Sequence, residues 1–184
     1  MPAKSITVPL DQSTIDDLRS GDHVLISGTL LTARDAAHKR LVEALERSEL
    51  LPIDLQGQVV YYVGPAPAKP GHPIGSVGPT TSSRLDSFTP ALLAAGMRGM
   101  IGKGYRSPAV RDAIAQFGAV YFAALGGTGA LLARHITSAE VIAYADLDTE
   151  AIHRLTIVDF PTIVVNDRYG GDAYQDALRE YAEE

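Results

Sequence analysis

"AIAQFGAVYFAALGGTGALLA", residues 113–133, is the stretch that decides the fold. It carries no formal charge, and its length would suffice to cross a bilayer as a helix. However, the polar Gln116 and Thr128 and a series of glycines interrupt it. Residues 119–125, "AVYFAAL", are therefore predicted to form a fully buried strand, and residues 126–135 a turn that leads into a helix. The segment favours an α/β fold without a membrane span.

Strands and helices alternate on either side of this buried strand. Residues 97–118 predict a strand followed by a helix, and residues 58–64, "QVVYYVG", predict a further strand. The other elements that we expect are strands at 4–10 and 23–33, helices at 11–22, 35–49, 82–96 and 173–184, and β structure at 140–147 and 152–167. The β-rich ends are not followed by helices of matching length. We therefore predict one mixed α/β domain over residues 1–184 rather than a regular doubly wound sheet.

Glycine and proline mark two places with unusual backbone. Gly28, inside the strand predicted at 23–33, indicates a bulge or the close approach of another backbone. Residues 64–79, "GPAPAKPGHPIGSVGP", are rich in proline and glycine and show little periodicity. Their composition fits an interdomain linker, and a shaped loop that runs over a site is the other interpretation.

The composition argues against several classes of function. The 184 residues are 46% apolar and 21% charged, which is typical of a globular protein, and the net charge is −6. An acidic chain is poorly suited to nucleic acid, because phosphate binding needs clustered basic surface. The chain has no cysteine, so it supplies no disulfide and no thiolate ligand for zinc or an iron–sulfur cluster. The first residues lack the apolar core of a signal peptide, and we expect a cytoplasmic protein.

The common catalytic motifs are incomplete. Leu132 stands where the third glycine of a dinucleotide-binding loop belongs, and Gly104 follows Lys103 where a phosphate-binding loop needs a hydroxyl residue. The five histidines show no metal-ligand spacing, and His38 is interpreted as a residue of a helix surface. Motifs of this type therefore predict no reaction.

Basic and hydroxyl residues recur at three predicted strand-to-helix junctions. Arg34 stands at the first, Thr80 and Arg84 at the second, and Lys103 and Arg106 at the third. In open α/β sheets, ligands collect at the carboxyl ends of strands, where helix N-termini favour an anion. Arginine adds a planar fork that suits a carboxylate, and lysine adds a point charge. The recurrence predicts a pocket for a dianion.

Each of these residues also has a simpler interpretation. The hydroxyl run at 80–83 is of the type that caps a helix. Arg34 is equally a surface arginine beside Asp35, and Lys103 stands between two glycines, as in a plain turn. The residues alone leave these alternatives open.

Five segments together resemble one known family. They are "LLTARDAAHKRL" (30–41), "VVYYVGPAPAKPGHPIGSVGPTTSSRLD" (59–86), "MIGKGYRS" (100–107), "GGTGALLA" (126–133) and "VDFPTIVVNDRYG" (158–170). In this order they are similar to the β subunit, or C-terminal domain, of the class I fumarase and L-tartrate dehydratase family, whose members are iron–sulfur hydro-lyases. The patterns A-R-D-x-A-H, G-P-T-T-S-x-R-x-D and G-K-G-x-R are specific in combination and weak singly.

The resemblance implies a fold, a partner and a site. The fold would be α/β, a single swivelling β/β/α-type domain with a mixed sheet, in which residues 64–79 form a folded loop. The partner would be a cysteine-bearing α subunit in an α2β2 assembly. That subunit would carry a 4Fe–4S cluster, and this chain would bind no metal or cofactor. The residues that bind the dicarboxylate substrate would be Arg34, Thr80, Arg84 and Lys103, with Thr80 as the catalytic hydroxyl near the reacting carbons.

The same resemblance implies a reaction. We expect the chain to take part in the reversible hydration of fumarate to L-malate, a reaction of the tricarboxylic acid cycle, and to be inactive without its α partner. The alternatives are the β subunit of an L(+)-tartrate dehydratase, which forms oxaloacetate, a stand-alone dicarboxylate-binding module, and a C-terminal piece of a fused fumarase chain. Thr128 departs from the pattern, since a small apolar residue is expected there.

Overall fold

The computed structural model describes residues 2–182 and places residues 113–132 in three elements and the turns between them. They are the end of helix α4 (Pro108–Phe117), strand β5 (Val120–Ala123) and helix α5 (Gly129–Leu132). The side chains of Val120, Tyr121 and Phe122 are fully buried. No helix within residues 2–182 is long and apolar enough to span a membrane. The buried strand is thus confirmed at Val120–Ala123, although Leu125, which the prediction included, is exposed, and the glycine turn into a helix is confirmed.

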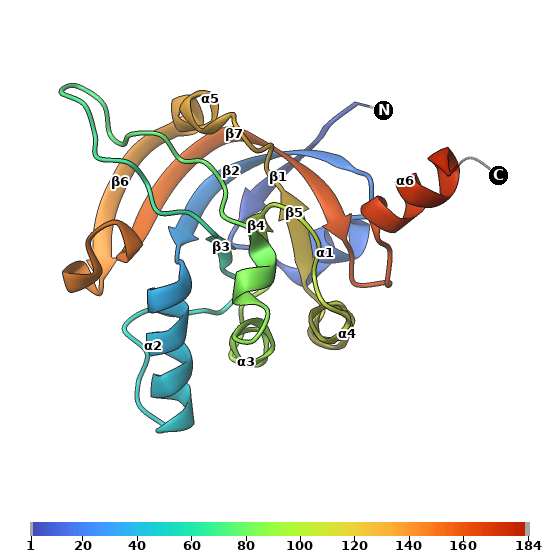
Figure 1. Ribbon diagram of the computed structural model, residues 1–184, viewed down its shortest axis with the longest axis horizontal. Coiled ribbons are helices and arrows are strands. Elements are labelled where there is room, and N and C mark those ends of the chain that lie inside the picture. Colours follow the sequence, from blue (N-terminus) through green and yellow to red (C-terminus); the bar gives the residue numbers. More distant parts are fainter. Residues whose placement is uncertain (1, 183–184) are drawn as a thin grey trace.

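Seven strands form one mixed sheet in the order β1-β2-β3-β4-β5-β7-β6. Besides β5, they are β1 (Lys4–Val8), β2 (His23–Thr32), β3 (Val59–Tyr61), β4 (Gly99–Gly102), β6 (Ile136–Ala143) and β7 (Ile152–Asn166). Strands β1 to β5 run parallel to one another. Strand β7 runs antiparallel to β2, β5 and β6. Because β7 pairs with both β5 and β2, the sheet curls until it closes on itself (Figure 1). The predicted mixed α/β fold is confirmed.

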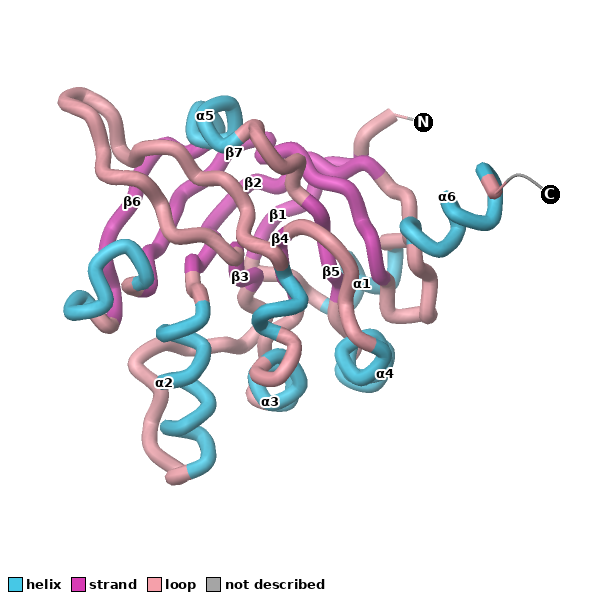
Figure 2. The backbone as a smooth tube through the Cα atoms, in the orientation of Figure 1, coloured by secondary structure: helices cyan, strands magenta, loops and turns pink. Residues whose placement is uncertain are grey.

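Helices cover one face of this sheet. Figure 2 shows α2 (Asp35–Glu46), α3 (Thr89–Ala94) and α4 side by side below the strands, with α5 on the other side. The remaining helical elements are α1 (Gln12–Asp17), α6 (Ala173–Tyr181) and the 3₁₀ turns η1 (Ser82–Leu85), η2 (Ala133–His135) and η3 (Ala145–Glu150).

The run "VVYY" illustrates how the two faces of the sheet are filled. Val59 and Tyr61 belong to a core enclosed by the strands, while Val60 and Tyr62 belong to a second core beneath α2, α3 and α4. Successive side chains of a strand point to opposite faces, so a strand buried on both faces is apolar at every position. This is why the sequence shows continuous apolar runs here instead of alternation.

Most expected elements are shorter in the structure, and the helix predicted at 11–22 is reduced to Gln12–Asp17. The helix predicted at 82–96 is two pieces, η1 and α3, because Pro90 cannot donate a backbone hydrogen bond and favours the first turn of a new helix. The strand expected at 140–147 ends at Ala143, and η3 follows. The last two residues of the helix predicted at 173–184 lie outside the described residues.

Residues 64–79 form a folded loop that runs beside β6 (Figure 1). Ile74 and Val77 are buried, and the backbone N–H of Ala66 donates to the carbonyl of Ser76 at 2.9 Å. The hydroxyl of the buried Tyr61 donates to the carbonyl of Val77. These contacts fix the loop against the sheet, so the linker interpretation is wrong.

Candidate functional site

The candidate residues stand at the carboxyl ends of the parallel strands β2, β3 and β4. Arg34 follows β2 and is the N-cap residue of α2. Thr80 returns to the end of β3, where its N–H donates to the carbonyl of Tyr62 at 2.7 Å. Lys103 directly follows β4 and pairs with Thr81 in a parallel bridge. The three predicted junctions therefore meet at one edge of the sheet, where the carboxyl ends of the neighbouring parallel strands lie together.

Arg34 and Arg84 converge on the carboxylate of Asp35. Its Oδ1 accepts hydrogen bonds from Nε of Arg84 at 3.0 Å and lies 3.0 Å from Nη2 of the same guanidinium. Its Oδ2 lies 3.7 Å from Nη2 of Arg34. The side chain of Arg84 is 52% exposed, and that of Arg34 is 24% exposed. One carboxylate thus holds both arginines of the predicted site.

Two further residues fix Arg34. A Cβ on Gly64 would lie 3.0 Å from Nη1 of Arg34, so the guanidinium rests on bare backbone there. Glu150 lies 3.6 Å from Nη2 of Arg34, and its other oxygen accepts from the N–H of Ala36 at 2.8 Å. Glu150 therefore satisfies a free donor at the start of α2 and pairs with Arg34 at the same time.

Thr80 and Lys103 keep their polar ends available. Thr80 is half-buried, and within residues 2–182 its hydroxyl makes no hydrogen bond. Lys103 is exposed, and in the described part of the chain it forms no ion pair. Its stem passes Gly126, where an added Cβ would lie 3.7 Å from Cδ of the lysine.

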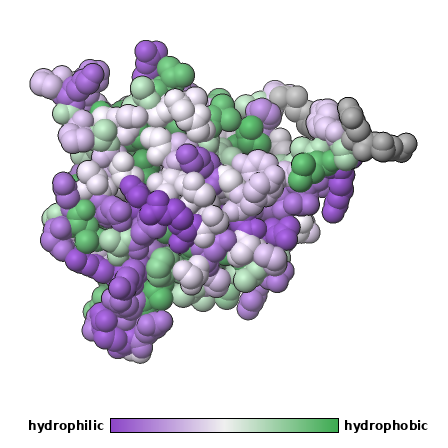
Figure 3. Space-filling model, viewed as in Figure 1, coloured by the Kyte–Doolittle hydropathy of each residue, from purple (hydrophilic) through white to green (hydrophobic). Residues whose placement is uncertain are grey.

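The site lies at the surface of the protein, where Arg84 and Lys103 are exposed. A cavity of about 490 Å³ lies elsewhere, between β5, α5 and β7, and its lining includes none of the four predicted residues. Figure 3 shows hydrophilic side chains gathered over the outer end of α2, where Glu46 and Arg47 are exposed. The candidate site, by contrast, is the basic sheet edge with Arg34, Arg84 and Lys103. An exposed basic edge binds a small anion weakly unless another surface covers it.

The hydroxyl run at 80–83 does not cap a helix. Thr81 is the N-cap residue of η1, and no side-chain hydroxyl accepts a capping hydrogen bond. Ser82 is buried, and its hydroxyl lies 2.9 Å from that of Tyr121, which donates to the carbonyl of Gly104 at 2.9 Å. Burial raises the pKa of Tyr121, so the phenol keeps its proton for this bond. The capping interpretation is therefore wrong, and Ser82 joins two loops of the site.

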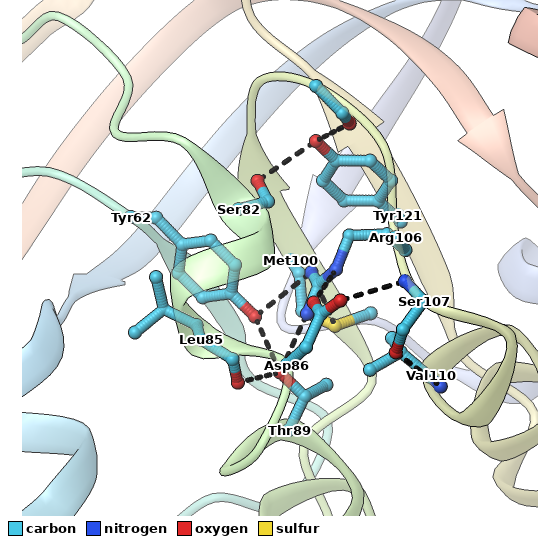
Figure 4. A network of polar contacts seen from close by, with 11 residues as sticks. Tyr62, Ser82, Leu85, Asp86, Thr89, Met100, Arg106, Ser107, Val110 and Tyr121 are labelled. Atoms are coloured by element: carbon cyan, nitrogen blue, oxygen red, sulfur yellow. Dashed lines mark hydrogen bonds and ion pairs between the residues drawn. The ribbon is translucent and has the colours of Figure 1, made fainter.

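Arg106, the second basic residue of the third junction, points into the protein (Figure 4). Its side chain is fully buried; Nε donates to Asp86 at 2.8 Å and Nη2 donates to Thr89 at 2.7 Å. The guanidinium also lies over the rings of Tyr62 and Tyr121. Arg106 is thus a buried structural residue that joins the β4–α4 loop to α3 and lies out of reach of a ligand at the surface.

His38 is buried, so its assignment to the helix surface is wrong. Its Nδ1 donates to the carbonyl of Arg34 at 2.9 Å, and its ring packs edge-on against Tyr62 at 5.1 Å. Burial lowers the pKa of His38 to about 4, and the charge of Arg106 acts in the same direction. His38 is therefore neutral at pH 7 and supports the backbone at Arg34 from behind.

Asp35 and Glu150 are the residues of this edge that the sequence did not single out as site residues. The position of Asp35 in the sequence could have indicated a role at the site, because it directly follows Arg34 at the start of a helix. An acidic residue is common there for another reason, since it interacts favourably with the helix dipole. The position of Glu150 gave no such indication, because Glu150 lies in η3, more than a hundred residues from Arg34, and reaches it only through the pairing of β7 with β2.

The sequence of the chain is similar to those of known proteins. Residues 3–177 match the family described as "Fumarase C-terminus". The chain belongs to this family. The resemblance inferred from the motifs is thereby confirmed, and it covers nearly the whole sequence.

Relatives of this Fumarase C-terminus chain are hydratases and dehydratases by name. The "Fumarate hydratase class I, anaerobic" of Escherichia coli (strain K12) is 35% identical over 181 residues, which are 97% of this chain and 32% of the relative. The "L(+)-tartrate dehydratase subunit beta" of the same organism is 31% identical over 98% of this chain and 90% of its own length. A "Putative L(+)-tartrate dehydratase subunit beta" of Methanocaldococcus jannaschii is 31% identical over 95% and 92%. The chain spans about a third of the fumarate hydratase and about nine tenths of either β subunit.

Proposed function

We propose that this chain is the β part of a hydro-lyase that adds water to fumarate to give L-malate. The observation that carries the proposal is the meeting of Arg34, Arg84, Lys103 and the free hydroxyl of Thr80 at one sheet edge of a Fumarase C-terminus chain. Two arginine forks and a lysine suit the two carboxylates of a small dicarboxylic acid. L(+)-tartrate is the alternative substrate, because two similar β subunits carry that name.

The four residues have separate roles in this proposal. Arg34 and Arg84 bind carboxylates, and Lys103 adds charge at the rim of the site. Thr80 holds its hydroxyl near the reacting carbons, where it takes part in moving a proton, the step that a positioned side chain accelerates in general acid–base catalysis.

The iron–sulfur cluster implied by the resemblance does not fit the residues of this chain. The sequence has no cysteine, and the part that the structure describes has no group of three histidine, cysteine, aspartate or glutamate residues that could hold a metal ion. We therefore assign the cluster to a cysteine-bearing α partner, with which this chain forms a shared active site. The open sheet edge supports that assignment, because a second surface would complete it.

The test is to assay the chain alone and together with its candidate α subunit after cluster reconstitution under anaerobic conditions. Fumarate hydration is expected only from the complex, and comparison of kcat/KM for fumarate and L-tartrate identifies the substrate. Hydration of fumarate by the metal-free chain alone would contradict the proposal. Tight dicarboxylate binding by a lone chain that associates with no α subunit would favour the stand-alone module.

A further inference from the structure

Asp35 links the two arginines of the candidate site from the first turn of α2. Arg84, which lies 49 residues away in the sequence, directs Nε and Nη2 to Oδ1 of Asp35, each at 3.0 Å. Oδ2 faces Nη2 of Arg34 at 3.7 Å, is buried, and has no hydrogen-bond partner within residues 2–182. Asp35 therefore lies between the two guanidinium groups and is only partly exposed to water.

The geometry leaves one end of Arg84 free. Asp35 contacts the Nε side of its guanidinium, and in the described part of the chain Nη1 has no hydrogen-bond or ion-pair partner. A ligand carboxylate can bind the outer nitrogens of an arginine whose Nε side is already occupied, because the guanidinium carries five donors in a rigid plane. Asp35 thus orients Arg84 without covering the end that faces outward.

Two arginines close together repel each other, and Asp35 offsets that repulsion. The carboxylates of Asp35 and Glu150 are the anionic groups near Arg34, but Glu150 makes its closest contact, at 2.8 Å, with the backbone of Ala36. Among the carboxylates of residues 2–182, Asp35 alone contacts both arginines. We propose that Asp35 is a positioning residue that fixes Arg84 beside Arg34, so that both forks face one dicarboxylate; the inference rests on the proposed function.

A carboxylate beside an anion site has two opposing effects. It repels the anion, and it holds the arginines in place. All three side chains are partly exposed, so water and salt screen the repulsion. Without its acceptor, by contrast, the long side chain of Arg84 regains its rotamers and must be ordered again by the ligand. The loss of Asp35 is therefore expected to weaken dicarboxylate binding and not to tighten it.

The first experiment needs no ligand and follows the side-chain signals of Arg84 and, as a control, Arg40. In the chain labelled with ¹⁵N-arginine, Asp35→Asn is expected to shift the Nε–H resonance of Arg84 and to speed its exchange with water. Asp146→Asn is the matched control, because Asp146 forms a bidentate pair with Arg40 of α2 outside the site. It is expected to change the signal of Arg40 and to leave that of Arg84. An Arg84 signal that Asp35→Asn leaves unchanged would overturn the proposal.

The second experiment measures L-malate binding to the same variants by calorimetry, and KM and kcat in the complex with the α partner. Asp35→Asn is expected to weaken binding and raise KM roughly tenfold, the scale of one charge-assisted hydrogen bond, with a smaller effect on kcat. The control is expected to match the wild type. Equal or tighter binding by Asp35→Asn would overturn the positioning role.

Failure of the proposed function gives a different result. If the wild-type chain and its complex bind no dicarboxylate while Asp35→Asn still releases Arg84, the proposed function and the ligand half of the inference fail together, and Asp35 is only a bridge. Asp35→Glu replaces the asparagine variant if that variant does not fold. It keeps a charge at the start of α2 but moves the carboxylate by one methylene, and the same loss of Arg84 order and of affinity is expected.

Discussion

The four hydroxyl residues at 80–83 differ in what their side chains contact. The hydroxyl of Thr80 is free, whereas that of Ser82 is buried against Tyr121. The backbone of Thr81 pairs with that of Lys103 in a parallel bridge. The side chain of Ser83 is exposed. Ser82 anchors the loop, and this leaves Thr80 at the surface with a hydroxyl that can act on a ligand.

Substitutions at Thr80 and Arg84 separate chemistry from binding. In the complex with the proposed α partner, Thr80→Val is expected to lower kcat by roughly 10²-fold, the usual scale for a lost acid–base group. Its melting temperature should stay near that of the wild type, because the hydroxyl caps nothing. Arg84→Lys keeps the charge but loses the fork, so it should mainly raise KM.

Ser83→Ala is the control for both variants, since Ser83 is an exposed hydroxyl of the same run. Steady-state kinetics and melting curves are the measurements. A Thr80→Val enzyme with normal kcat would show that this hydroxyl has no part in the reaction.

His38 makes stability depend on pH in a defined window. Burial lowers its pKa to about 4 in the folded chain, whereas the unfolded value is about 6.5. Between these values the unfolded chain binds a proton that the folded chain does not, so stability is lost as pH falls from 6.5 to 4. The loss from this residue is about 3 kcal/mol, at 1.36 kcal/mol for each pKa unit.

The measurement is urea unfolding of the wild type and of His38→Asn at several pH values from 7.5 to 4. Asparagine keeps a donor for the carbonyl of Arg34 but does not titrate. His38→Asn is expected to be less stable at pH 7.5 and to lose less stability on acidification. The exposed His72→Asn is the control and should follow the wild-type curve. A His38→Asn curve with the wild-type slope would contradict the prediction.

Among the elements, the loops after β3 and β4 carry arginines of opposite roles. Arg84 in η1 points outward to Asp35, and Arg106 before α4 points inward to Asp86 and Thr89. Both stand at a predicted strand-to-helix junction, so the local sequence predicts the same role for the two arginines. The difference arises because Asp86, which follows η1, and Thr89, the first residue of α3, provide acceptors for Arg106 where α3 packs against α4.

The network of Arg106 is expected to be important for stability rather than for binding. Arg106→Lys keeps the charge in the interior but cannot reach Asp86, Thr89 and Tyr62 together. Unfolding free energy is expected to fall by about 3 kcal/mol, because buried acceptors lose their donors. Arg154→Lys, at an exposed pair with Glu140, should cost less than about 1 kcal/mol. Urea unfolding measures both, and equal losses would contradict the structural role of Arg106.

At the scale of the whole molecule, the long strand β7 holds the two halves of the sheet together. It pairs with β2 over most of its length and with β5 near its end, although both are far from it in the sequence. The bulge predicted at Gly28 lies where this pairing shifts register, and φ of Gly28 is +116°. A Cβ on Gly28 would collide with the backbone carbonyl of Val8 in β1. The bulge and the close approach are both confirmed.

Gly28→Ala is expected to destabilise the whole sheet. The substitution meets a positive φ and a backbone atom that cannot move without shifting β1, so we expect a loss of about 3 kcal/mol or more. Gly71→Ala is the control, since φ of Gly71 is +80° but nothing lies within 4 Å of the added Cβ. It should cost about 1 kcal/mol. Equal costs in denaturant unfolding would show that the contact with Val8 is unimportant.

The sequence by itself determined the class of fold, most element positions and the family. The apolar run "AVYFAAL", the glycine breaks after it and the ordered motifs are local properties, and strand burial and turns follow from local chemistry. Local chemistry also placed Arg34, Thr80, Arg84 and Lys103 at strand-to-helix junctions, and in the structure Arg84 lies in η1; whether they bind a dicarboxylate stays a prediction.

Only the tertiary structure decided which of these side chains face outward. Arg106 and His38 turn inward because α3, α4 and Tyr62 surround them, and Asp35 meets Arg84 because β2 and β3 are neighbours in the sheet. Such contacts join residues tens to more than a hundred positions apart, as with Glu150 and Ala36. A local pattern fixes the spacing of residues along a strand or helix, but their partners depend on the order in which the strands pair.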